Sequence, residues 1–165
     1  METKDLMEFS IDKENKKVKV VREFKASLPK VWEAWTDRQL LDQWWAPKPW
    51  KAETKTLEFK EGGYWLYAMV GPEGEKHWGR TNFISIQPLK GYTATDVFCD
   101  ENGIIDESFP GSAWVSEFTE QDGMTTVTMN INFKAQADLD QMIDMGFQGG
   151  FTAALENLDE LLTSR

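Results

Sequence analysis

The last segment of the chain, residues 138–162, carries a continuous apolar stripe at helical spacing, and this feature limits the fold most. A helix with one long apolar face must bury that face against another layer of secondary structure. Asp138 and Gln141 have the spacing of a capping box at its start. The stripe consists of Leu139, Met142, Ile143, Gly146, Phe147, Gly150, Phe151, Ala154, Leu155, Leu158, Leu161 and Leu162.

The sequence "GFQGG", residues 146–150, lies in the middle of this predicted helix. Glycine in a helix interior costs about 1 kcal/mol relative to alanine, so two glycines next to each other need a reason. One interpretation is close packing of the helix on a sheet. The other is that the small residues leave space for a ligand beside Phe147 and Phe151.

The sheet that would receive this helix is predicted from the preceding part of the chain. Residues 17–26 alternate as a strand, and six more strand segments follow near 52–59, 63–70, 76–86, 91–99, 112–118 and 124–134. Glycine-containing turns separate them, and the short links favour antiparallel hairpins. Segment 63–70 is apolar on both faces, so both faces should be covered at least in part.

Two short helices are predicted between the first and second of these strands. Ser27 and Pro29 suit the start of the first helix, and Asp37 can cap the second, which ends at "APKP" because proline cannot continue a helix. The order of elements predicts an α+β fold: a curved antiparallel sheet of seven strands, with the long helix across its concave face and the short helices over one end.

The stretch "DRQLLDQWWAPKPW", residues 37–50, contains three tryptophans at a proline-broken corner. Tryptophan is costly to expose, so these rings should pack against apolar groups. Helical spacing places Trp32, Trp35 and Trp44 in the core. For Trp45 and Trp50 the alternative is that one of them lines a pocket.

Composition narrows the class of partner. The chain has 165 residues, which fits one domain over residues 1–165, and its formal net charge is −10. Such a charge repels nucleic acid and anionic membrane surfaces, and no apolar run approaches the ~20 residues of a membrane span. The first residues show no signal-peptide pattern, and a single cysteine, Cys99, cannot form an internal disulfide. We therefore expect a cytoplasmic protein.

Four motifs resemble a known family. "ASLPKVWEAWTDRQLLDQWWAP" at 26–47, "EGGYW" at 61–65, "GPEG" at 71–74 and "ALENLDELL" at 154–162 are similar to segments of the SRPBCC, or START-like, superfamily. The match is to its branch of activator-of-heat-shock-protein-ATPase homologues. The resemblance implies the helix-grip fold of the birch-pollen allergen, in which a seven-stranded sheet wraps a C-terminal helix and often leaves an apolar cavity. The loop at 100–112 is longer than is common in the family and could lie over the mouth of that cavity.

Catalytic chemistry has little support in the residues. His77 is the only histidine, so paired-histidine metal ligation is excluded within one chain, and no G-x-S-x-G motif presents a nucleophile. We predict no catalytic residue, no metal ligand and no cofactor. Cys99 is expected to be a small buried apolar residue. Asp96 and Glu117 lie within strand segments, and an inward-facing one would need a partner or a raised pKa. Such an acid would be the best sign of catalysis, because related cyclases and aromatases use a few polar groups in the cavity.

The predicted function is the binding of a hydrophobic or aromatic small molecule between the sheet and the C-terminal helix. His77 is the candidate polar anchor. The alternative is that the aromatic and methionine side chains simply fill the interior and leave no cavity. The resemblance also implies two alternatives: a protein-interaction module with a chaperone as partner, although the chain has no room for a separate chaperone-binding domain, or an enzyme of the polyketide cyclase/aromatase type. The predicted ligand-binding residues are Trp45, Trp65, Tyr67, Met69, His77, Trp78, Met142, Phe147 and Phe151.

Overall fold

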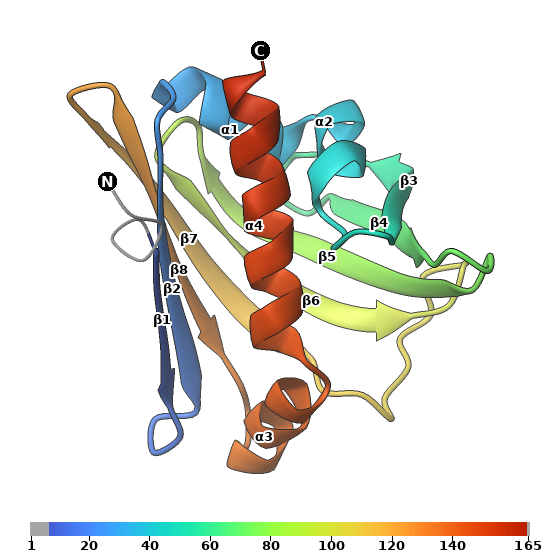
Figure 1. Ribbon diagram of the computed structural model, residues 1–165. Coiled ribbons are helices and arrows are strands. Elements are labelled where there is room, and N and C mark those ends of the chain that lie inside the picture. Colours follow the sequence, from blue (N-terminus) through green and yellow to red (C-terminus); the bar gives the residue numbers. More distant parts are fainter. Residues whose placement is uncertain (1–6, 165) are drawn as a thin grey trace.

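A computed structural model describes residues 7–164 and shows one antiparallel sheet that curves around a long C-terminal helix (Figure 1). This is the predicted α+β helix-grip fold. The sheet order is β1-β2-β8-β7-β6-β5-β4-β3. The early strand β2 therefore pairs with the last strand, β8. The strands are β1 (Met7–Asp12), β2 (Lys17–Phe24), β3 (Lys51–Leu57), β4 (Tyr64–Val70), β5 (Lys76–Gln87), β6 (Gly91–Cys99), β7 (Ser112–Gln121) and β8 (Met124–Asn132). The helices are α1 (Leu28–Thr36), α2 (Arg38–Trp44), α3 (Gln136–Asp144) and α4 (Phe147–Thr163).

The sheet has eight strands, so the prediction of seven was wrong by one edge strand. The additional strand, β1, pairs antiparallel with β2 from Met7↔Arg22 to Asp12↔Lys17. Its sequence, MEFSID, is short and half polar, because an edge strand buries only part of one face. Period-two alternation is weak in such a segment, which explains why the pattern did not reveal it.

The predicted single helix over 138–162 is also wrong, because two helices meet at a break. Gly146 has φ of 90°, a left-handed conformation that glycine adopts without steric strain. Gly146 therefore separates the two helices, whereas Gly149 and Gly150 lie inside α4 near its start. The first helix starts earlier than predicted, after Ala135, so Asp138 lies inside its first turn and forms no capping box with Gln141.

The short helices α1 and α2 cover one end of the sheet, as predicted (Figure 1). Ser27 occupies the N-cap position of α1 but makes no hydrogen bond there through its side chain. Asp37 does cap α2, because its carboxylate accepts a hydrogen bond of 2.8 Å from the backbone N–H of Gln39.

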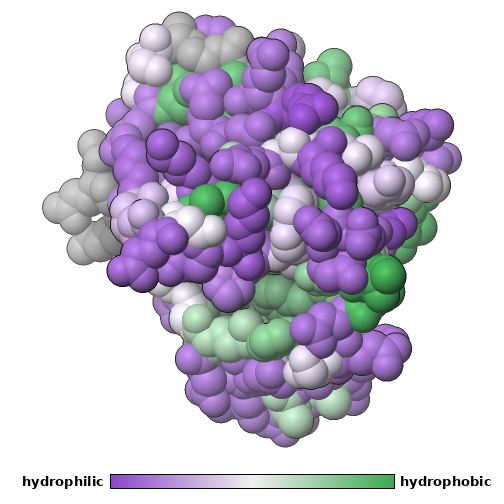
Figure 2. All heavy atoms as spheres, turned by 90° about the vertical axis from the view of Figure 1, so that its right-hand side faces the viewer, coloured by the Kyte–Doolittle hydropathy of each residue, from purple (hydrophilic) through white to green (hydrophobic). Residues whose placement is uncertain are grey.

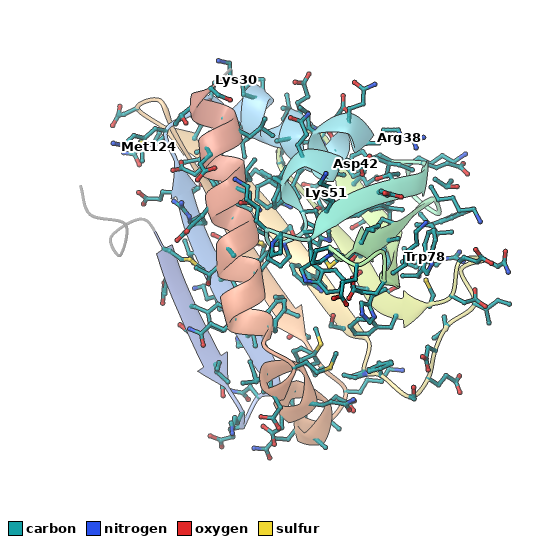
Figure 3. All side chains as sticks on the ribbon, turned by 45° about the vertical axis from the view of Figure 1, so that its right-hand side comes forward. Lys30, Arg38, Asp42, Lys51, Trp78 and Met124 are labelled. Carbon is teal, nitrogen blue, oxygen red and sulfur yellow. The ribbon has the colours of Figure 1, made fainter. Side chains whose placement is uncertain are left out.

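A polar network fixes α2 to β3. Oδ1 of Asp42 accepts hydrogen bonds from both the N–H (2.9 Å) and the hydroxyl (2.6 Å) of Thr54. Arg38 donates to the Thr54 carbonyl at 2.7 Å, and Nε1 of Trp65 donates to the Thr54 hydroxyl at 3.0 Å. Figure 3 shows Arg38 and Asp42 on the helix beside this edge of the sheet. The network fixes the direction in which the chain leaves α2, and this direction sets the position of the tryptophan that follows.

The core lies between α4 and the concave face of the sheet. The alternating apolar residues of β2 and β8 are fully buried there, and both faces of β4 are largely covered, as predicted. Trp44 is 0% exposed and donates from Nε1 to the Ala34 carbonyl at 2.9 Å. Trp35 is buried beside it, whereas Trp32 is half-buried and packs edge-on to Phe118 at 5.0 Å. The two core predictions for Trp35 and Trp44 are confirmed, and Trp32 lies at the margin of the core.

Candidate functional site

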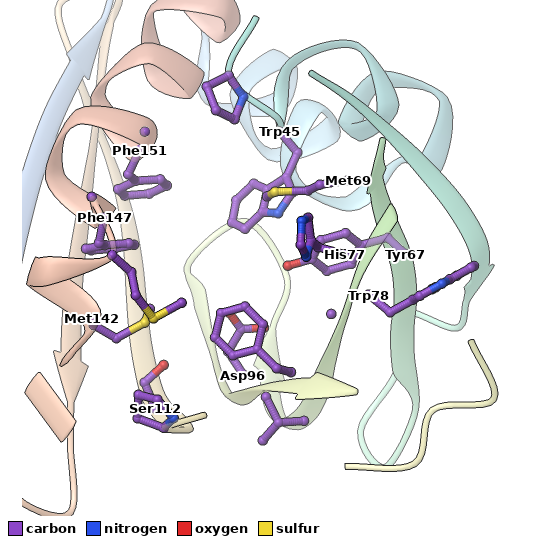
Figure 4. Close-up of a pocket in the computed structure, with 18 of the residues that line it drawn as sticks. Trp45, Tyr67, Met69, His77, Trp78, Asp96, Ser112, Met142, Phe147 and Phe151 are labelled. Atoms are coloured by element: carbon purple, nitrogen blue, oxygen red, sulfur yellow. The ribbon is translucent and has the colours of Figure 1, made fainter. Parts of the chain in front are cut away.

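An apolar cavity of about 240 Å³ lies between the sheet and the start of α4, at the end that α1 and α2 leave open (Figure 4). Strands β4 to β7, the corner after α2 and the α3–α4 junction all contribute to its wall. Apolar cavities of about 150 Å³ can hold benzene, so this one has room for a small aromatic molecule. We call it the ring-lined cavity. Its lining includes Trp45, Pro47, Tyr67, Met69, His77, Asp96, Phe98, Pro110, Ser112, Trp114, Met142, Met145, Phe147, Gly150 and Phe151.

The helical wall of the cavity is built from stacked rings. Phe147 and Phe151 are one turn apart on α4, with ring centroids 5.4 Å apart and an interplanar angle of 13°. Trp114 from β7 meets Phe151 edge-on at 5.6 Å, and Met142 from α3 completes this side. These contacts hold the rings in place without filling the cavity.

Gly150 keeps part of the space open. A methyl group added to its Cα would meet only Cγ of Pro47, at 3.9 Å, which is ordinary van der Waals contact. The glycine is therefore not needed for close approach of the helix to the sheet. This supports the interpretation that small residues in "GFQGG" leave room beside the phenylalanines.

Trp45 forms the roof of the cavity. Its ring packs edge-on against Trp65 at 5.2 Å and against Phe151 at 6.0 Å. Its Nε1 atom is buried and has no hydrogen-bond partner of normal geometry within residues 7–164. Trp50, the other tryptophan of the proline corner, does not line the cavity and instead packs on His77 at 5.4 Å.

The sheet wall presents Tyr67 and Met69 from β4, and Figure 4 shows the Tyr67 hydroxyl pointing into the cavity. Gly79 on β5 makes this placement possible, since a Cβ there would lie 2.8 Å from the Tyr67 hydroxyl oxygen. Trp65 lies behind the wall, stacked on Tyr67 at 4.2 Å, and does not line the cavity itself.

His77 and Trp78 border the outer part of the site. His77 is exposed at the mouth, near the start of β5. Trp78 is the next residue on the strand and also borders the cavity, although Figure 4 shows its ring directed away from the cavity. The Nζ atoms of Lys55 and Lys76 lie 5.9 and 6.0 Å from the centre of its ring.

Asp96 is the polar centre of the cavity, and the sequence left its direction open. It points inward from β6, and one oxygen accepts a hydrogen bond of 2.8 Å from the Thr81 hydroxyl. Burial raises the pKa of its carboxyl to about 6, although the bond from Thr81 opposes the shift. Burial, and then the nearby Asp96 charge, raise the pKa of Tyr67 well above its usual value; the nearby Trp45 indole opposes this rise. Glu117, the other strand acid, is exposed.

One polar residue and one ring of the cavity, Ser112 and Trp114, were missed by sequence reasoning. The Ser112 hydroxyl accepts a hydrogen bond of 2.9 Å from Nε1 of Trp114, so both side chains face the same interior. Alternation along "SAWVSEF" places Trp114 on the same face as the buried Ser116 and Phe118, and this pattern could have identified it. A second space of about 20 Å³ lies deeper inside and shares Trp45, Asp96 and Trp114 with the cavity.

Cys99 ends β6 near the cavity and is half-buried, whereas a fully buried residue was predicted. Burial, with a smaller contribution from the neighbouring Asp100 carboxylate, raises the pKa of its thiol to about 11. The thiolate is therefore scarce at neutral pH, and this residue is a poor nucleophile.

The loop between β6 and β7 lies beside the mouth of the cavity. Phe109 packs on Phe98 at 5.1 Å, and Pro110 lines the cavity itself. Ile104 and Ile105 of this loop are 66% and 53% exposed. In Figure 2 a band of apolar atoms crosses an otherwise hydrophilic face of the molecule.

The fold agrees with what comparisons of this chain with known proteins show. A family profile described as "Activator of Hsp90 ATPase homolog 1-like protein" matches residues 25–163. The chain belongs to this family. The family predicted from the tryptophan, glycine and leucine motifs is thereby confirmed.

Solved structures of other proteins show the same architecture. A solution structure of a protein from Arthrobacter aurescens is similar with a TM-score of 0.91 and 29% identity, over 97% of this chain and 93% of that one. A crystal structure of a Mycobacterium smegmatis protein gives 0.88 and 28%, over 96% and 97% of the two chains. A Staphylococcus epidermidis protein gives 0.82 and 29%, over 94% of each. A comparison with curated protein sequences gave no match.

Membership of the activator-homologue family supports a ligand-binding or chaperone-activator type of domain and leaves the specific ligand or partner open. Within residues 7–164, every helix is too short or too polar to span a membrane.

Proposed function

We propose that this activator-homologue domain binds a small apolar or aromatic molecule in the ring-lined cavity. The observation that carries the proposal is an open apolar space between sheet and helix, with one inward acid among its rings. Ligand sites are mostly apolar with a few well-placed polar groups, and this cavity has that composition. Its volume of about 240 Å³ is slightly below the ~300–1,000 Å³ usual for drug-sized ligands, so the ligand should be small.

Several proposed contacts follow from the geometry. Trp45, Tyr67, Met69, Met142, Phe147 and Phe151 would touch the ligand directly. His77 would stand at the mouth as a polar anchor. Trp65 would act by supporting Tyr67, and the ring of Trp78 would lie outside the contact surface. Because Trp45 and Trp114 line the cavity, a bound aromatic compound should quench tryptophan fluorescence.

The test is a panel of small aromatic compounds measured by fluorescence quenching and thermal shift. Saturable binding is expected with the unmodified protein and with Gly149→Leu, whose added side chain would point into open solvent. Gly150→Leu should abolish binding while leaving the protein folded, because its side chain enters the cavity. Absence of saturable binding by every compound, or equal binding by both leucine variants, would contradict the proposal.

A second candidate is a protein-interaction role, which the exposed apolar residues of the 100–112 loop favour. Ile104, Ile105 and Phe109 present apolar side chains to solvent on one loop. Together with the description of the family, they support contact with a chaperone. Stimulation of the ATPase activity of an Hsp90-type chaperone by this protein, lost on Ile104→Ser with Ile105→Ser, would establish this role.

The cyclase-like alternative has one observation in its favour, the inward Asp96. A carboxyl group whose pKa is about 6 can donate and accept a proton near neutral pH. In a carbon–carbon ring closure, the ionised Asp96 carboxylate would remove a proton from the attacking carbon, and a second group would donate a proton to the carbonyl oxygen. The Tyr67 hydroxyl, which stays protonated and points into the cavity, is the group placed to donate it. Loss of cyclisation of a small polyketone substrate in Asp96→Asn would support this alternative over binding alone.

A further inference from the structure

The polar groups of the ring-lined cavity are not balanced. Asp96 uses one carboxyl oxygen to accept from Thr81, and within residues 7–164 no hydrogen bond reaches its other oxygen. This oxygen faces the cavity from a half-buried residue, and a carboxylate oxygen in apolar surroundings is stabilised when it gains a hydrogen-bond donor. The cavity therefore presents an acceptor that a ligand can satisfy.

No lysine or arginine within the described residues lines the cavity to balance this acid. The ionisable groups that interact with Asp96 are Tyr67 on β4, and Tyr92 and Cys99 on its own strand. All three are neutral at pH 7, and burial raises their pKa values further. His77 on β5 lies at the mouth. The helical wall, from Met142 to Phe151, contributes only methionine, glycine and phenylalanine side chains.

The rings add to the same electrostatic preference. Aromatic faces are electron-rich and attract cations within about 6 Å of the ring centre. Tyr67, Trp45, Trp114 and Phe151 surround the space above the carboxyl group. The formal charge of −10 on the whole chain also draws cations toward the protein.

We infer that the ligand of the ring-lined cavity is an aromatic or apolar molecule that carries a cationic amine, received by Asp96. The ammonium group donates to the free carboxylate oxygen, and the apolar body packs between Trp45 and the phenylalanines of α4. This inference rests on the proposed function and names its ligand class. Carboxylates, fatty acids and phosphorylated molecules are excluded, because their charge would meet Asp96 without a compensating cation.

The experiment compares three compounds of nearly equal size: phenethylamine, which is cationic, propylbenzene, which is neutral, and phenylacetate, which is anionic. Isothermal titration calorimetry at neutral pH should give the tightest binding for phenethylamine and none for phenylacetate. Asp96→Asn should weaken binding of phenethylamine at least about tenfold and leave propylbenzene unchanged. Asp122→Asn is the matched control, because it removes the same charge at an exposed turn with φ of 53°, which asparagine tolerates.

The pH dependence gives a second measurement that needs no change in the cavity. Phenethylamine keeps its proton between pH 5 and about pH 8, as lysine-type amines do. Its affinity should therefore fall as pH is lowered through about 6, where the Asp96 carboxyl gains a proton. His77 is the other titratable side chain that lines the mouth, and it serves as the control: His77→Gln should keep this fall and Asp96→Asn should remove it.

The outcomes separate the two proposals. If propylbenzene binds as tightly as phenethylamine, or if Asp96→Asn leaves the preference intact, the amine inference is overturned and the cavity remains a binding site. If none of the three compounds binds, both proposals fail.

Discussion

The two ends of the space between sheet and α4 are both built from aromatic rings, yet they treat polar atoms differently. At the closed end, Trp44 is fully buried and its indole N–H is paired with the Ala34 carbonyl. At the open end, the next residue, Trp45, has a buried N–H that makes no hydrogen bond of normal geometry, although the Tyr67 hydroxyl lies near it. One carboxylate oxygen of Asp96 also accepts no hydrogen bond there. Adjacent residues in the sequence thus serve one region that is finished by folding and one that a ligand can complete.

The difference has a physical lesson. Unpaired buried polar groups lower stability, so a protein that retains them concentrates them where a ligand can supply the missing bond. Substitutions at the closed end should therefore lower stability, whereas substitutions at the open end should weaken binding and can raise stability.

The largest expected effect is at Trp44. Trp44→Ala removes a fully buried ring and leaves the Ala34 carbonyl unpaired, so it should cost about 3–5 kcal/mol of unfolding free energy. Trp45→Ala should cost clearly less, because it enlarges an existing cavity. Urea denaturation of both variants measures the contrast, and equal losses would mean that the two ends do not differ.

The next largest effect is expected for Asp96→Asn, which should raise the free energy of unfolding. Between the ordinary carboxyl pKa of 3.8 and its raised value of about 6, the folded protein holds a proton that the unfolded chain has released. Stability therefore falls as pH rises through this window, by up to about 3 kcal/mol for a shift of this size. Asp96→Asn should remove this fall, so its advantage over the unmodified protein should be near zero at pH 4 and largest above pH 6. Thermal unfolding of both proteins from pH 4 to pH 7 measures this. A difference in stability that does not change with pH would contradict the prediction.

A smaller loss is expected from the network at the closed end. Asp42→Ala removes the acceptor of two hydrogen bonds from Thr54, which should cost about 2 kcal/mol. Exposed Asp144→Ala is a suitable comparison on α3, and it should change stability by less than about 0.5 kcal/mol. Equal denaturation midpoints for the two variants would show that the network does not hold α2.

The smallest effect on stability is expected at Gly150. Leucine is a better helix former than glycine, and the new side chain meets open space, so Gly150→Leu should change unfolding free energy by no more than about 1 kcal/mol in either direction. Its effect on ligand binding should nevertheless be complete. A large loss of stability would indicate that the cavity is closed in solution.

The regular elements were largely predictable because they repeat. Period-two patterns identified β2 to β8, and proline and aspartate marked the ends of the short helices. The edge strand β1 was missed because half of its residues are polar, and the break at Gly146 was missed because the apolar stripe continues across it. A backbone turn at one glycine leaves no trace in helical periodicity.

The site was harder to predict than the fold. Tyr67, Phe147 and Phe151 were found because rings on buried faces are visible in the sequence. Strand parity could not say whether Asp96 points inward, since both faces of the neighbouring strands carry apolar residues. Trp78 does border the cavity, as predicted from the sequence, but the alternation of β5 directs its ring away from the cavity.

The pairing of β2 with β8 bears on how the protein acquires its structure. Lys17 lies opposite Asn132, so a strand made at the start of synthesis finds its partner only after more than a hundred further residues have been added. Non-local pairing of this kind slows folding, because the loop must close before the contacts form. During synthesis, the apolar face of β2 must wait without its partner, and the chain depends on finishing quickly or on protection from aggregation until β8 and α4 arrive.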